Sequence, residues 1–203
     1  MSGRHPAMRY ILPCLLPSPV RDYHQALVDE LAARFDLRIT QRQAIPAHFT
    51  LKYHFEADDI TPVEALLADF AGRHAAAPVT VGDFGHFDEN VVFATVALSP
   101  AAQTLLEALF SSLRPLRWMP WSPHDGAHLR PHMTLVEECR RRFAEVWRHL
   151  AGRARHFPAA LDNLTLLRQT GTDEDGLARW ALHRTFMLGG AGGLGDAGAN
   201  PPR

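Results

Sequence analysis

The sequence has few of the residues that mark several common protein classes. Its 203 residues include two cysteines, Cys14 and Cys139, and neither lies in a CxxC pair or at metal-ligand spacing. This argues against a disulfide framework and against a zinc finger. No run of about 18 apolar residues occurs, so no membrane-spanning helix is expected. The N-terminus also lacks the apolar core of a signal peptide, and we therefore expect a cytoplasmic protein.

Lysine is almost missing from the sequence. Of the 21 lysine and arginine residues, Lys52 is the only lysine. The net charge of −1 argues against a protein that binds nucleic acid through its overall charge. The charge is nevertheless uneven. Residues 110–156 hold nine arginines and four acids, a balance of +5, and the remainder of the chain carries −6. This basic half can attract a phosphate-bearing ligand, or it can simply be a solvated arginine-rich helix face.

What is present is typical of a folded domain, with 46% apolar and 21% charged residues. The spacing of apolar residues and the positions of proline and glycine predict strands and helices along the chain. Their order nearly repeats between the two halves. We expect a Gly-rich disordered tail at 189–203. The expected strands are 8–16, 37–40, 47–55, 78–87, 90–98, 129–137, 161–170 and 178–188, and the expected helices are 19–35, 61–74, 99–113 and 140–152.

A short motif occurs once in each half. Residues 48–51 read His-Phe-Thr-Leu and residues 132–135 read His-Met-Thr-Leu, each after a proline-containing turn. Because side chains alternate along a strand, the histidine and threonine of each copy share one face while the two apolar residues point to a core. A single copy arises often by chance, but two strand-borne copies indicate a paired site. Its four polar residues are His48, Thr50, His132 and Thr134.

The two motifs and the order of elements around them resemble the 2H phosphoesterase superfamily, and within it the 2′-5′ RNA ligase and RNA 2′,3′-cyclic phosphodiesterase branch. The resemblance covers about residues 8–188. It implies an α+β fold of two pseudo-symmetric lobes, each an antiparallel sheet with flanking helices, that face one another across a central cleft. We therefore expect residues 1–188 to form one bilobal domain.

The resemblance also implies a metal-independent phosphodiesterase, with no cofactor, that opens 2′,3′-cyclic phosphate ends of RNA or nucleotides. His48 and His132 would be the acid–base pair, and Thr50 and Thr134 would hold the phosphate. Imidazole suits both roles because its pKa lies near neutral pH. The sequence leaves open which histidine is the acid, with a preference for His48. Run backward with an RNA 5′-hydroxyl, the same site would form a 2′-5′ linkage. The expected partner is an RNA end or a small nucleotide, and the chain is expected to be a monomer.

Four further residues are candidates for substrate binding. By strand period, Lys52 shares the face of His48 and Thr50, and Arg130 shares the face of His132 and Thr134. Each can contact substrate phosphate, or it can be a rim charge paired with an acid. Trp118 and Trp121 precede the second motif, where a base can stack on one of them, although loop tryptophans also cap cores.

Three alternatives remain open at this point. Residues 124, 128 and 132 are histidines spaced four apart, as in a helical metal site, but Gly126 and Pro131 interrupt a helix and no acidic or cysteine ligand completes the set. The chain can instead be a non-catalytic module that binds RNA or nucleotides. It can also act on another small nucleotide such as ADP-ribose 1″,2″-cyclic phosphate, because fold and motif do not fix the substrate.

Overall fold

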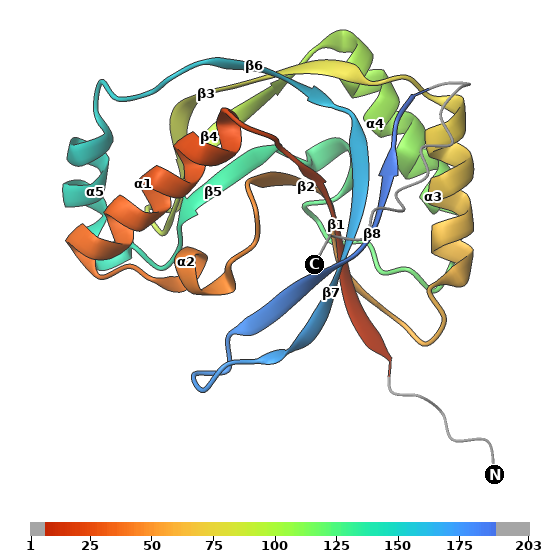
Figure 1. The fold of residues 1–203 in the computed structure, drawn as a ribbon, viewed down its shortest axis with the longest axis horizontal. Helices are drawn as coiled ribbons and strands as arrows, with labels where there is room; N and C mark the ends of the chain where they lie inside the picture. Colours follow the sequence, from red (N-terminus) through yellow and green to blue (C-terminus); the bar gives the residue numbers. More distant parts are fainter. Residues whose placement is uncertain (1–6, 190–203) are drawn as a thin grey trace, which may run out of the picture.

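The structure, a computed structural model, describes residues 7–189, and the predicted tail beyond Gly189 lies outside them. Eight strands and five α-helices make up this part of the chain, together with short 3₁₀ turns at Gly126–His128 and Arg140–Arg142 (Figure 1). The helices are α1 (Val20–Phe35), α2 (Ile39–Gln43), α3 (Thr61–Arg73), α4 (Pro100–Leu113) and α5 (Phe143–Leu150). The strands are β1 (Met8–Leu15), β2 (His48–Ala57), β3 (Ala77–Phe87), β4 (Val91–Leu98), β5 (His132–Val136), β6 (Phe157–Leu161), β7 (Asn163–Thr172) and β8 (Ala178–Met187).

The strands form two four-stranded antiparallel sheets, one in the order β2-β1-β7-β8 and the other in the order β5-β4-β3-β6. The edge strands β2 and β5 each carry one copy of the motif, and these two strands contact one another. The last two strands of the chain, β7 and β8, complete the sheet that β1 and β2 begin. The α+β fold of two antiparallel sheets with flanking helices, predicted from the sequence, is confirmed.

Two apolar clusters hold the sheets and helices together. The larger joins both sheets to α3 and α4, with Phe49, Leu51, Phe70 and Leu113 among its fully buried members. The smaller packs α1 and α5 against β5 and the start of β4. α4 begins where the Ser99 side chain accepts a hydrogen bond from the Ala102 amide, with Pro100 in the first turn. Each motif strand is thus fixed by its apolar residues.

Some local predictions were wrong. Residues 37–40, expected as a strand, contribute to the short helix α2. β6 was not predicted, and β5 begins at His132, so that Arg130 precedes the strand instead of lying in it. Across residues 7–189, no helix has the length and apolar character needed to cross a membrane.

Candidate active site

The two motifs meet at one cavity. His48, Thr50, His132 and Thr134 all line a cavity of about 450 Å³ between the sheets. All four side chains are half-buried, whereas the residues that alternate with them, Phe49, Leu51, Met133 and Leu135, are fully buried. Strand periodicity therefore places the four polar side chains as the sequence indicated.

Both histidines are held in the same way. His48 Nδ1 lies 2.8 Å from the Pro46 carbonyl oxygen, and His132 Nδ1 lies 2.7 Å from the Arg130 carbonyl oxygen. In each case the carbonyl belongs to the residue two positions earlier. A carbonyl only accepts, so each Nδ1 carries the proton and donates it. Nε2 is then the nitrogen left to exchange protons with a ligand.

Burial keeps these imidazoles neutral. Loss of water around His48 lowers its pKa to about 4, although the Pro46 carbonyl favours the charged form. Nearby His24 and His132 lower that pKa further. Burial also lowers the pKa of His132, against the effect of the Arg130 carbonyl. At neutral pH both Nε2 atoms of the unliganded site are therefore proton acceptors.

A third histidine, which the sequence reasoning missed, lines the same cavity. His24 lies on the buried face of α1 and is 4% exposed. Its Nε2 donates to the Thr134 carbonyl oxygen at 2.7 Å, which ties α1 to the second motif. Burial lowers the pKa of His24, and its Nδ1 has no hydrogen-bond partner among the described residues. His24 therefore stays neutral and fixes the backbone beside His132.

The placement of Lys52 on the face of His48 and Thr50 was wrong. The pairing of β1 with β2 shifts twice, so that Tyr10 is opposite Phe55, Leu12 opposite Lys52 and Pro13 opposite Thr50. These irregularities break the alternation of β2, because an extra residue in one strand turns the following side chains to the other face. Leu51 and Lys52 are consequently both buried, and Lys52 does not line the cavity.

Lys52 instead forms a buried ion pair with Asp125. Its Nζ lies 2.9 Å from Asp125 Oδ2, and the two side chains are 1% and 0% exposed. The Asp125 carboxylate also accepts from the amides of Ser122 and Tyr53. Burial by itself would raise the pKa of Asp125, but the hydrogen bonds from Lys52, Ser122 and Tyr53 lower it. Lys52 thus anchors the loop that leads to the second motif onto the strand that carries the first.

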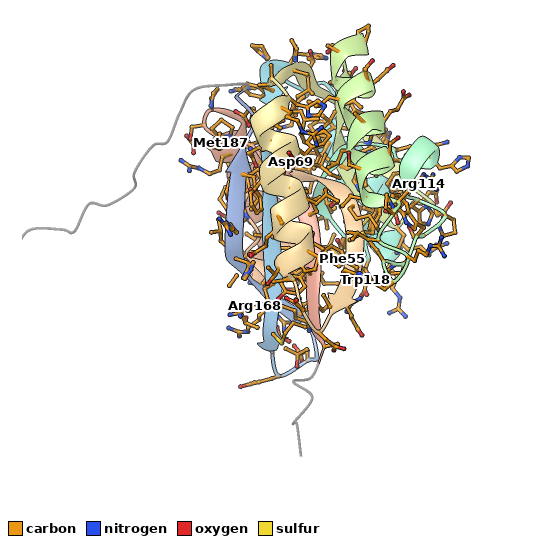
Figure 2. The ribbon with its side chains drawn as sticks, turned by 90° about the vertical axis from the view of Figure 1, so that its right-hand side faces the viewer. Phe55, Asp69, Arg114, Trp118, Arg168 and Met187 are labelled. Atoms are coloured by element: carbon orange, nitrogen blue, oxygen red, sulfur yellow. The ribbon has the colours of Figure 1, made fainter. Side chains whose placement is uncertain are left out.

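The two predicted tryptophans lie elsewhere. Trp118 is 45% exposed, and its ring lies 6.3 Å from that of Phe55. Figure 2, which views the molecule from the side of α3 and α4, shows Trp118 on that outer side. Trp121 packs against Phe110 and lies beneath Lys52 and Arg114. Neither lines the histidine cavity, so the structure gives no support to base stacking on Trp118 or Trp121.

Arg9 and Trp180 line the cavity in their place, and neither was singled out from the sequence. Arg9 is opposite Glu56 in the β1–β2 ladder, whereas Leu15 is opposite His48, so Arg9 lies toward the far end of the cavity. Trp180 comes from β8, the edge strand of the first sheet. Arg9 is the one charged residue in the apolar strand β1, and this contrast could have indicated it.

Arg130 is exposed and lines a neighbouring pocket instead of the histidine cavity itself. His124 and His128 line that same pocket. Within the part of the chain that the structure describes, no three His, Cys, Asp or Glu side chains are arranged to hold a metal ion. The spacing of His124, His128 and His132 therefore does not create a metal site there.

Comparison with known proteins gives a consistent result. The model of the 2′-5′ RNA ligase superfamily matches residues 17–173. A Geobacillus kaustophilus protein, whose name provisionally assigns it to the phosphoesterases, is 27% identical over 188 residues, or 90% of this chain and 98% of that protein.

Two solved structures share the fold. TT0787 of Thermus thermophilus is 20% identical with a TM-score of 0.60, and the match covers 90% of this chain and 99% of that one. Escherichia coli LigT is 15% identical with a TM-score of 0.56, covering 90% and 98%.

Proposed function

The chain belongs to the 2′-5′ RNA ligase superfamily, whose named relatives here are phosphoesterases, and from this we propose that it hydrolyses 2′,3′-cyclic phosphate ends of RNA or nucleotides. The observation that carries the proposal is the pair of imidazoles in one cavity, each with Nδ1 bound to a carbonyl and with Nε2 lacking a hydrogen-bond partner among residues 7–189. Between them, two such nitrogens can take one proton from a nucleophile and give one to a leaving group.

The proposed reaction needs one neutral and one protonated imidazole. One Nε2 takes a proton from water as the water oxygen bonds to phosphorus. The other donates a proton to the ribose oxygen as its bond to phosphorus breaks, which leaves a phosphomonoester and a free hydroxyl. Thr50 and Thr134 donate hydrogen bonds to the non-bridging oxygens, where negative charge accumulates. With an RNA 5′-hydroxyl in place of water as the nucleophile, the same site forms a 2′-5′ linkage.

The environment of His48 favours it as the base. Its pKa of about 4 keeps it unprotonated over the neutral range, and His24 and His132 both oppose a positive charge there. His132 is then the acid, which reverses the preference drawn from the sequence. An anionic phosphate between the two imidazoles stabilises the imidazolium and raises both pKa values when substrate binds.

The rest of the cavity suits a nucleoside. Its volume of about 450 Å³ is in the range of small-molecule sites, and Trp180 and Arg9 offer a ring face and a cation. LigT, which shares the fold, has been solved with 3′-AMP, with ATP, with NADP+ and with phosphate. These complexes support a nucleotide as the ligand of this chain as well.

The proposed function is tested with a panel of cyclic phosphates in the presence of EDTA. The panel contains the four 2′,3′-cyclic mononucleotides, an RNA oligonucleotide with a 2′,3′-cyclic end and ADP-ribose 1″,2″-cyclic phosphate, with product resolved by chromatography. We expect turnover of the 2′,3′-cyclic ends. Turnover of the ADP-ribose compound alone would replace the proposed substrate, and no turnover of any of them would refute the proposal.

The pH dependence should show the lowered pKa values. In the unliganded protein, one protonated and one neutral imidazole coexist only between the pKa values of His48 and His132, both of which lie below 6.5. We expect kcat/KM to be bell-shaped and to fall as pH rises through the range above 6.5. The kcat profile should lie at higher pH, because bound phosphate raises both pKa values. A kcat/KM that rises to a plateau above pH 7 would contradict this.

A further inference from the structure

A second pocket adjoins the histidine cavity. It measures about 680 Å³, and Tyr53 and Phe87 line both it and the cavity. Phe87 also contacts the catalytic side directly, since its ring lies edge-on to that of His132 at 5.0 Å. The second pocket and the histidine cavity therefore share Tyr53 and Phe87 in their linings, and Phe87 lies directly beside His132, the proposed acid. A ligand that reacts at the histidines and is longer than one nucleotide has this pocket beside it.

The lining of the second pocket combines positive charge with rings. Arg130, His124 and His128 come from the loop before β5 and are exposed. Across the described residues, no carboxylate forms an ion pair with Arg130, so its guanidinium is available to a ligand. The Tyr53 ring lies 6.2 Å from the His124 ring at an interplanar angle of 59°. Arginine suits a phosphate and the rings suit a base, the two parts of a nucleotide.

This loop is held firmly beside the site. The buried carboxylate of Asp125 pins it to Lys52 and to the amide of Tyr53, at the irregular part of β2. Gly126–His128 then forms a 3₁₀ turn, and the Arg130 carbonyl holds His132. One segment of eleven residues, 122–132, thus supplies most of the lining of the second pocket together with the proposed acid. Its anchoring means that the pocket does not have to be assembled when a ligand arrives.

We propose that the second pocket binds the nucleotide that precedes the cyclic end of an RNA chain, with Arg130 on the connecting phosphate and the base against Tyr53 and His124. This proposal rests on the proposed function and narrows its substrate from any cyclic nucleotide to an RNA end. Asp88 is the acid at the rim, and it is exposed, so water screens its repulsion of the phosphate. The substrate is therefore recognised by two phosphates, one at the histidines and one at Arg130.

The first test compares turnover of adenosine 2′,3′-cyclic phosphate with that of a diadenosine dinucleotide carrying the same cyclic end. We expect kcat/KM of the dinucleotide to be at least tenfold higher, as one charge-assisted contact allows. A dinucleotide with a neutral methylphosphonate linkage should lose most of this advantage. Equal kcat/KM for the mononucleotide and both dinucleotides would overturn the proposal while leaving the proposed function intact.

The second test uses Arg130→Gln, with Arg117→Gln as the matched control. Both arginines are exposed, both lie between α4 and β5, and Arg117 lines neither pocket. Arg130→Gln should lower kcat/KM about tenfold for the dinucleotide and leave the mononucleotide within twofold, and Arg117→Gln should leave both within twofold. An equal loss for both substrates in Arg130→Gln would place Arg130 at the reacting phosphate and overturn the proposal.

A binding measurement separates this proposal from the question of turnover. Calorimetry with a dinucleotide that ends in a 3′-phosphate, and with 3′-AMP, needs no catalysis. We expect the dinucleotide to bind at least tenfold more tightly to the wild type and to Arg117→Gln, but not to Arg130→Gln. Equal affinities for the two ligands in the wild type would refute the second subsite even if every cyclic phosphate is hydrolysed.

Discussion

Replacing His132 with asparagine is expected to lower kcat by about a thousandfold, the typical contribution of a general acid or base. Asparagine keeps an N–H group near the position of Nδ1, so it can still donate to the Arg130 carbonyl, but it has no counterpart of Nε2. The substitution therefore removes the proton-transferring atom and retains the backbone anchor. His48→Asn does the same at the Pro46 carbonyl and should cost a similar factor.

The measurement is steady-state hydrolysis of the best 2′,3′-cyclic substrate, with binding of 3′-AMP as a second readout. We expect the dissociation constant of 3′-AMP to change less than tenfold, since the threonines and Arg9 remain. His156→Ala is a suitable control, because His156 is exposed and lies outside the cavity. The double variant should be about as slow as either single one, because the two imidazoles act as a unit. Activity within tenfold of the wild type in either single variant would contradict the two-histidine mechanism.

Replacing Lys52 with methionine is expected to destabilise the protein by about 3–5 kcal/mol, which corresponds to a fall in Tm of roughly 10 °C for a chain of this size. Methionine fills most of the volume of lysine but leaves Asp125 buried without its cation. Although the Ser122 and Tyr53 amides still donate to that carboxylate, they do not neutralise it. Thermal unfolding followed by circular dichroism measures the effect.

The double variant Lys52→Met/Asp125→Asn tests whether the unpaired charge of Asp125 causes this loss of stability. Asparagine removes the buried negative charge, and its single oxygen can still accept from the Tyr53 amide, although its NH2 group cannot accept from the Ser122 amide. Because the unpaired charge costs more than one lost hydrogen bond, the double variant should be more stable than Lys52→Met alone. Arg73→Met provides a comparison, since it breaks the exposed Arg73–Asp69 pair within α3 and should cost less than about 1 kcal/mol. If Lys52→Met unfolds at the wild-type temperature, the buried pair does not anchor the loop.

The motif residues were predictable because they obey strand periodicity on both sides of the site. His48 and Thr50 face the cavity, and Phe49 and Leu51 face the core. The next residue was not predictable by the same rule, because the ladder shifts before Lys52. One sign of this was present in the sequence. Pro13 lacks an N–H group, yet β1 lies inside its sheet, and a proline in such a strand marks an irregular pairing.

His24 illustrates a different limit of sequence reasoning. It falls on the same helical face as Val20, Leu27 and Leu31, where a histidine is more often a core residue than part of a site. Only the packing of α1 against β5 brings it beside the second motif. The hypothesis that a base stacks on Trp118 or Trp121 gained no support for a related reason. The positions of these residues depend on the path of an irregular loop, and residue spacing carries little information about such a path.

The order of strands has a consequence for how the protein is made. The first sheet begins with β1 and β2 but is completed by β7 and β8, which are synthesised more than 100 residues after His48. His48 therefore leaves the ribosome on an unfinished sheet of two strands, which α1 and α2 separate in the sequence, and so small a sheet is marginally stable on its own. A nascent chain that stops before residue 163 has both histidines but lacks half of the sheet that aligns the first. Incomplete chains are thus expected to lack activity, and the exposed strand β1 makes them targets for chaperones and proteases.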